Sequence, residues 1–190
     1  FKAYYKEPKM THEQWAENKI YFPSQDVSPV TGPFQVKYSP HLRLPFKLLD
    51  RPEVEDIFAK WASQSAKSLL LMIAGAYKLD NEPGTILYRE PMKEDVAKVW
   101  TVKIDPVLKC IKDLWQKFED YTATEGIRTK DAIKQLAGGA WVVSGSSVKE
   151  RKSLSIMMLL LDEMGEFDSG ATEEASERLK AYSIFFPKRI

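Results

Sequence analysis

Residues 156–163 have the sequence IMMLLLDE, in which six apolar side chains lead directly into Asp162 and Glu163. An apolar run of this length without polar alternation is typical of a strand buried on both faces, and such strands belong mainly to parallel sheets covered by helices. We therefore predict a buried strand at 156–161 within an α/β fold. Ligands of such sheets bind at the carboxyl ends of the strands, where these two carboxylates lie.

Apolar segments elsewhere in the chain alternate between strand and helix patterns, as expected for a mainly parallel sheet flanked by helices. Residues 124–136 have no clear pattern. The other expected strands cover 56–62, 85–89 and 141–144, and the expected helices cover 68–78, 94–118 (broken or restarted at Pro106) and 172–182.

The first 45 residues form a region of different character. Thr11, Glu13 and Gln14 open a capped helix that extends to about Lys19. Residues 23–45 are rich in proline, which predicts an irregular, partly extended arm. We therefore divide the chain into a helix and arm at 1–45 and an α/β domain at 46–190.

Composition excludes several classes of protein. The chain of 190 residues is 44% hydrophobic and 29% charged, with a net charge of +1 and a single cysteine. A lone cysteine forms no internal disulfide and favours a reducing compartment. No apolar stretch approaches the roughly 20 residues that span a bilayer, and the first residues have no secretory signal pattern. A net charge this small does not hold a protein on DNA by charge alone, so any DNA contact is local, transient, or made by residues outside this chain.

Residues 61–68, WASQSAKS, stand between an expected strand and an expected helix. A phosphate-binding loop has the pattern G-x-x-x-x-G-K-[ST] in this context, and Lys67 and Ser68 match its last two positions. The lysine would reach the β- and γ-phosphate oxygens, and the serine would hold Mg²⁺. Trp61 and Ala66 replace the two glycines. An alanine forced to positive φ costs about 1–2 kcal/mol, so the loop is either strained or shaped differently. The alternative is an ordinary polar turn that caps a buried helix.

The acidic pair after the fourth strand supplies the complementary chemistry. Asp162 would bind Mg²⁺ through water, and Glu163 would polarise the attacking water. The alternative is a solvated acidic pair at a strand end. Because two expected strands lie between Lys67 and Asp162, the two motifs together favour a nucleotide-hydrolysing fold.

With these motifs the chain resembles the large terminase subunit of tailed bacteriophages, in the lambda-like group. The loop segment KWASQSAKS (60–68) and the segment LLLDEMGEF (159–167) carry the most specific part of the resemblance, and MTHEQWAENKIYFPSQ (10–25) and GGAWVVSGSS (138–147) occur in the order that the family has them. The resemblance implies a P-loop NTPase of the ASCE type, with ATP and Mg²⁺ as cofactors. The chain would stop before the last strands of that ATPase domain and before a nuclease domain.

The same resemblance implies a motor that pumps double-stranded DNA into a procapsid through a portal. Its partners would be a small terminase subunit and further copies of itself in a ring, and it would work in the host cytoplasm without a membrane. A helicase-like motor and a P-loop-like binding module without hydrolysis remain as alternatives.

The implied site residues follow from these motifs. Arg151 would reach the γ-phosphate of a neighbouring subunit, with Lys152 or a solvated turn as the alternatives. Tyr38 and Arg43 lie where related ATPases hold the adenine, with a packed arm as the alternative. The full expected set comprises Glu163 and Arg151 for catalysis, Ser63, Gln64, Ser65, Ala66, Lys67, Ser68, Tyr38 and Arg43 for the nucleotide, and Ser68 and Asp162 for the metal.

Overall fold

The computed structural model describes most of the chain. The described residues are 10–25, 28–62, 64–82, 84–91, 96–125, 133–144, 156–162 and 188–189. The helix expected at 172–182 lies outside these ranges, as do Ser63, Arg151 and Glu163.

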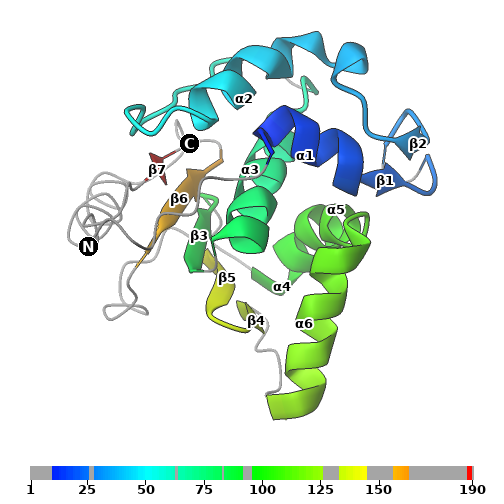
Figure 1. Cartoon of the computed structure of the whole chain (residues 1–190), viewed down its shortest axis with the longest axis vertical. Coiled ribbons are helices and arrows are strands. Elements are labelled where there is room, and N and C mark those ends of the chain that lie inside the picture. The colour runs from blue at the N-terminus through cyan, green and yellow to red at the C-terminus, as the bar shows by residue number, and fades with distance from the viewer. Residues whose placement is uncertain are drawn as a thin grey trace.

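A five-stranded, mainly parallel sheet forms the centre of the fold, in the order β4-β5-β3-β6-β7 (Figure 1). Strands β5, β3, β6 and β7 run parallel to one another, and β4 pairs with β5 antiparallel. This sheet confirms the predicted α/β class. The strands are β3 (Thr85–Arg89), β4 (Ile133–Leu136), β5 (Gly139–Ser144), β6 (Met158–Leu161) and β7 (Lys188–Arg189).

Strand β6 is buried along its whole length, as its apolar run predicts. Met158 and Leu160 belong to the main hydrophobic cluster on one face of the sheet. Leu159 and Leu161 belong to a second cluster, which contains Leu87 of β3. Both faces are therefore covered, which fixes the strand that leads into Asp162.

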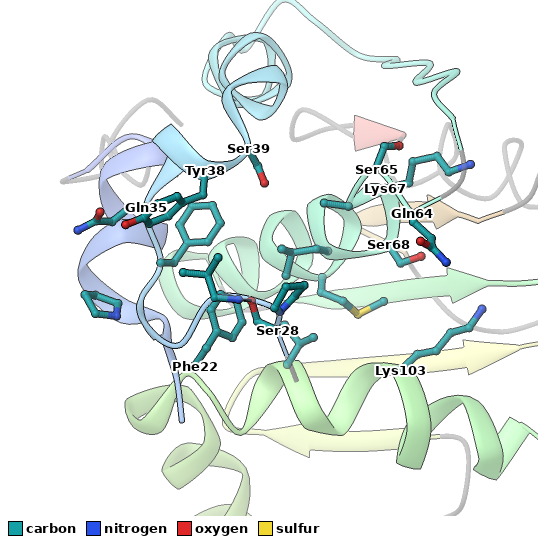
Figure 2. Close-up of a pocket in the computed structure, with 18 of the residues that line it drawn as sticks. Phe22, Ser28, Gln35, Tyr38, Ser39, Gln64, Ser65, Lys67, Ser68 and Lys103 are labelled. Carbon is teal, nitrogen blue, oxygen red and sulfur yellow. Dashed lines mark hydrogen bonds between the residues drawn. The ribbon is translucent and has the colours of Figure 1, made fainter. Parts of the chain in front are cut away.

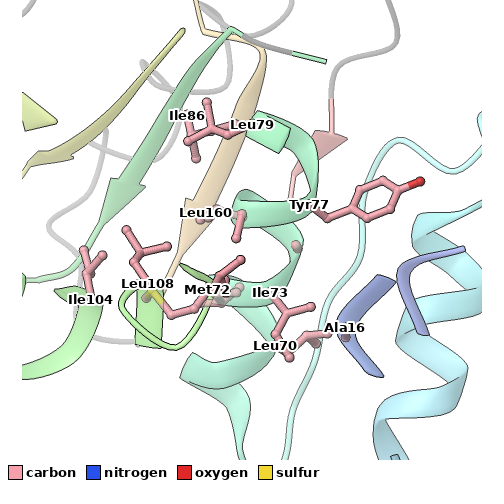
Figure 3. Packing of buried hydrophobic residues seen from close by; sticks show 14 of the residues in the cluster. Ala16, Leu70, Met72, Ile73, Tyr77, Leu79, Ile86, Ile104, Leu108 and Leu160 are labelled. Carbon is pink, nitrogen blue, oxygen red and sulfur yellow. The ribbon is translucent and has the colours of Figure 1, made fainter. Parts of the chain in front are cut away.

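Helix α3 (Lys67–Asn81) lies against the sheet and is apolar on most faces. Figure 3 shows its side chains between Ile86 and Leu160 of the sheet on one side and Ala16 of α1 on the other. Gly75 allows the close approach, because a Cβ at this position would lie 2.6 Å from Cη2 of Trp141 on β5. The close packing of α3 on the sheet thus depends on a glycine at position 75, since any larger residue would clash with Trp141.

Helix α1 (His12–Lys19) has the predicted capping box. The backbone N–H of Gln14 donates to Oγ1 of Thr11 over 3.2 Å, and the N–H of Thr11 donates to Oε1 of Gln14 over 3.1 Å. Asp50 Oδ1 accepts from the backbone N–H of His12 at 2.9 Å and lies 2.6 Å from its Nδ1. The imidazole stacks on Tyr77 of α3, with ring centroids 3.7 Å apart. These contacts fasten the N-terminal region to α3.

The arm is more structured than the sequence predicts. Its short strand β2 (Gly32–Pro33) pairs antiparallel with β1 (Tyr21–Phe22), which precedes the arm, and the 3₁₀ turns η2 (Val36–Tyr38) and η3 (Pro40–Leu42) lead into helix α2 (Arg43–Leu49). The expected boundary at residue 45 falls inside α2, and α1 shares the main hydrophobic cluster with α3. The division of the chain at this position stays a prediction.

The strand expected at 56–62 is wrong. Only Asp56 forms a single bridge, and the following residues run outside any strand to the loop. Ile57 is buried in the hydrophobic core, whereas the next residue, Phe58, is 77% exposed. A run of apolar residues is not enough to form a strand, because the strand backbone also needs a neighbouring strand as hydrogen-bonding partner.

The helical stretch expected at 94–118 is interrupted as Pro106 predicts. It consists of α4 (Val96–Val99), the π-helical turn η4 (Trp100–Ile104), α5 (Asp105–Leu108) and, after a turn, α6 (Lys112–Glu125). The ambiguous residues 124–136 contain the end of α6 and strand β4. Within the described part of the chain, no helix is both long and apolar enough to traverse a bilayer.

We expect Gly75→Ala to lower the free energy of unfolding by about 1–3 kcal/mol, because the new methyl group overpacks against Trp141. Alanine has a better helix propensity than glycine, so a loss of stability would have to come from the packing. Denaturant unfolding measures it. In a Trp141→Phe background, where the ring is smaller, the same change should cost less. Equal costs in both backgrounds would contradict the close contact.

Candidate functional site

The loop before α3 has a strained backbone. Ala66 is the N-cap of α3, with φ 60° and ψ 26°, in the left-handed region. Gln64 also has a positive φ, of 56°. Left-handed backbone favours glycine, and an alanine there costs about 1–2 kcal/mol. Of the two alternatives for the loop, the strained one holds: Ala66 takes the conformation that a glycine would take without cost.

The loop is held from several sides. The hydroxyl of Ser65 donates to the carbonyl of Ala62 over 2.6 Å. Nε2 of His41 lies 2.9 Å from the carbonyl oxygen of Ser65, and its ring meets that of Trp61 edge-on, with centroids 5.2 Å apart. The ammonium of Lys67 donates to the carbonyl of Trp61 over 3.4 Å. The arm thus supports the strained turn from outside.

The two sequence motifs meet in space. Oγ of Ser68, in the first turn of α3, donates to Oδ2 of Asp162 over 2.8 Å. The hydroxyl of Tyr88 on β3 donates to the same oxygen, also over 2.8 Å. The backbone N–H of Asp162 donates to the carbonyl of Arg89 over 3.0 Å, which continues the ladder between β6 and β3. Asp162 is only 5% exposed, so this carboxylate is fixed in position at the end of β6.

A cleft of about 600 Å³ opens beside this pair (Figure 2). One end is polar and contains the loop residues 64–68, Asp162 and Lys103. The other end is mainly apolar and lies between α3, α5 and the arm. Its apolar and aromatic lining comprises Phe22, Pro29, Val30, Pro33, Phe34, Tyr38, Met72 and Val107.

The structure brings most of the described candidate residues together, and one stays apart. Gln64, Ser65, Ala66, Lys67, Ser68, Asp162 and Tyr38 all line the cleft. Arg43 is not among the lining residues, and its Nε lies 3.5 Å from Oε1 of Glu13 on α1. Its expected contact with a base stays a prediction.

Sequence reasoning missed Tyr88, Lys103 and His41. Tyr88 stands in a buried strand and has the pattern of a core residue, whereas its hydroxyl orients Asp162. Lys103 lies on an irregular helix with no motif around it, and His41 lies in the proline-rich arm. Their roles depend on strand register and on packing between distant segments, so no local signal could have found them.

The site suits a phosphate group with a divalent cation. Phosphates bind readily at a helix N-terminus beside a lysine, and α3 has no side-chain cap that would compete. Among the described residues no group of three or more His, Cys, Asp or Glu could hold a metal. Mg²⁺ does not require one, since it usually takes one or two protein oxygens together with water and phosphate. Ser68 and Asp162 supply such oxygens.

A family model described as "Phage terminase large subunit gpA, ATPase domain" matches residues 28–181. The chain belongs to this family of terminase ATPase domains. The match covers most of the arm, the loop, and β6 with Asp162 at its end, which all contribute to the cleft, and it confirms the family that the sequence resembles.

The terminase assignment rests on the family model alone, and comparison with individual proteins does not add to it. No curated protein sequence matches the chain. The solved structure of the large terminase from a thermophilic bacteriophage matches with a TM-score of 0.44 and 11% sequence identity. The match covers 67% of this chain and 31% of that one, so the chain spans about a third of that terminase.

We expect Ala66→Gly to raise the free energy of unfolding by about 0.5–1 kcal/mol, because glycine relieves the left-handed strain but adds freedom to the unfolded chain. Ala76→Gly, inside α3, is the matched control and should instead lower it by about 1 kcal/mol or more. Urea unfolding compares the two. A loss of stability in Ala66→Gly would mean that the native loop does not hold this conformation.

Proposed function

We propose that the cleft binds ATP with Mg²⁺, and that the chain supplies the ATP-hydrolysing part of a DNA-packaging motor. The observation that supports this most directly is the hydrogen bond between Ser68 and Asp162, because it unites a phosphate-loop sequence with the carboxylate at the end of a buried strand. Membership of the terminase ATPase family supports the same proposal.

Lys67 would contact the phosphates. It is the first residue of α3, where the helix dipole is positive and an additional cation is unfavourable. Its ammonium donates a long hydrogen bond, of 3.4 Å, to the carbonyl of Trp61. The negative charge of a bound phosphate would offset the positive charges of the helix dipole and of Lys67. The N–H groups of the first turn would add hydrogen bonds to it.

Ser68 and Asp162 would hold the metal. Bound Mg²⁺ neutralises charge on the phosphates and helps to orient them. The chain contributes a hydroxyl and a carboxylate that already lie within 2.8 Å of one another. Tyr88 keeps the carboxylate in place through its own hydrogen bond, so little reorganisation is needed when the cation binds.

Two further roles rest on the sequence alone. Glu163 directly follows Asp162 and would orient the attacking water. Arg151 follows the Gly/Ser-rich sequence at 145–147 and would approach a phosphate held by a neighbouring subunit, where an arginine can raise the rate by about 10³–10⁵. Ser63 would add to the loop.

The apolar end of the cleft would take the base of the nucleotide. Tyr38 lies at this end and is 57% exposed; the ammonium of Lys37 lies over its ring, 5.0 Å from the centroid, so a base would stack on the opposite face. Arg43 would need to leave Glu13 in order to contribute.

Membership of the family supports a wider role in viral DNA packaging. Double-stranded viral DNA, a small terminase subunit and a portal would be the partners, a ring of copies would be the working assembly, and the host cytoplasm would be its location. The endonuclease of such motors would belong to another domain. With a net charge of +1, this chain would hold DNA only weakly by itself.

We expect Lys67→Ala to weaken ATP binding by about 10- to 100-fold, since a hydrogen bond to a charged group contributes about 1.5–3 kcal/mol. Titration calorimetry of the 190-residue chain with ATP and Mg²⁺ measures this. Lys47→Ala, on the exposed side of α2 and away from the cleft, should bind as the unsubstituted chain does. Unchanged binding in Lys67→Ala would exclude the phosphate role.

A further inference from the structure

Lys103 lines the polar end of the cleft together with the loop and Asp162. Figure 2 shows its side chain extending from the helical stretch opposite α3, towards the same end of the cleft as Gln64 and Ser68. It is about a third exposed, at 36%. A second lysine thus enters the region where Lys67 already stands.

An irregular helix places this lysine. The N–H of Asp105 donates to the carbonyl of Trp100, five residues earlier, so η4 is a π-helical turn. Pro106 explains it: proline has no N–H, and its ring clashes with the carbonyl four residues before it, so an ordinary α-helix cannot continue. Trp100 and Ile104 are both buried and anchor the turn from either end. Such turns occur frequently at functional sites.

Lys103 forms an ion pair with Glu90, which follows the end of β3. The side chain of Glu90 is only 7% exposed. Its second oxygen, Oε2, is buried and has no hydrogen-bond partner among the described residues. Burying a carboxylate oxygen without a hydrogen-bond partner is costly, and even a fully buried ion pair can often be replaced by apolar residues without loss of stability. Stability alone is therefore a poor reason for this pair.

We propose that Lys103 is a second phosphate-contacting cation of the cleft and that Glu90 is the counterion that holds it at the cleft wall. The inference rests on the proposed nucleotide site and adds a residue to it. A polyphosphate carries several negative charges, and Lys67 neutralises only one. Lys103 lies at the polar end, with its charge shared between Glu90 and the ligand.

Two variants separate this role from a structural ion pair. Glu90→Gln keeps the shape and an acceptor for the ammonium, and leaves the charge of Lys103 available. The double variant Glu90→Gln/Lys103→Gln removes both charges and leaves no buried charge alone. If Lys103 contacts phosphate, Glu90→Gln should bind ATP at least as tightly as the unsubstituted chain, and the double variant should bind it about tenfold more weakly than Glu90→Gln. The affinity of the double variant should also depend less on ionic strength.

Binding of adenosine, which has no phosphate, shows whether a variant has lost the shape of the cleft, because a structural change would weaken adenosine binding as well. Both variants should bind adenosine equally. Lys98→Gln, an exposed lysine of α4 that does not line the cleft, is the matched control and should bind ATP normally. Equal ATP affinity in Glu90→Gln and the double variant, or an equal loss for adenosine and ATP, would overturn the proposal. Failure of the unsubstituted chain to bind ATP, or normal binding by Lys67→Ala, would instead count against the nucleotide site itself.

Discussion

The hydrogen bond from Ser68 to Asp162 is the contact on which the site depends, because it ties the first turn of α3 to the carboxyl end of β6. Each partner is positioned by burial. Strand β6 is covered on both faces by separate hydrophobic clusters, so Asp162 has little freedom. Helix α3 lies close to the sheet because Gly75 leaves room for the ring of Trp141. The same packing that stabilises the domain therefore brings the hydroxyl and the carboxylate within 2.8 Å of one another.

Positive and negative groups alternate around this contact. Lys67 and the N-terminus of α3 are positive, Asp162 is negative, and Lys103 is held by Glu90. An anion alone would meet the carboxylate, and a cation alone would meet the lysine. A phosphate that carries its own divalent cation satisfies both, and the strained Ala66 turn lines the cleft where such a ligand would bind. The mixed charges thus suit a phosphate group with its own divalent cation better than either ion by itself, in agreement with the nucleotide that we propose.

Local patterns predict the parts of this structure whose cause is local. The strand at 85–89, the capping box of Thr11 and Gln14, and the interruption at Pro106 each follow from a few neighbouring residues. The strand expected at 56–62 fails because a strand requires a partner, which the segment itself does not reveal. Helix α2 escapes prediction because Pro40 and Pro45 suggest an arm, although a proline fits the start of a helical turn. Lys67, Ser68 and Asp162 carry motif signatures, whereas Tyr88 and Lys103 reach the site only through register and packing.

Mg²⁺-dependent ATP binding by Asp162→Asn tests the central claim most directly. Asparagine keeps one oxygen that can accept from Ser68 and Tyr88, and it replaces the other carboxylate oxygen by an NH₂ group, which removes the charge. Titration calorimetry with and without Mg²⁺ should show that the unsubstituted chain binds ATP more tightly when the cation is present. In Asp162→Asn that gain should disappear while binding without Mg²⁺ persists. A variant that keeps the full gain would contradict the account, because the carboxylate at the end of β6 would then have no part in holding the metal.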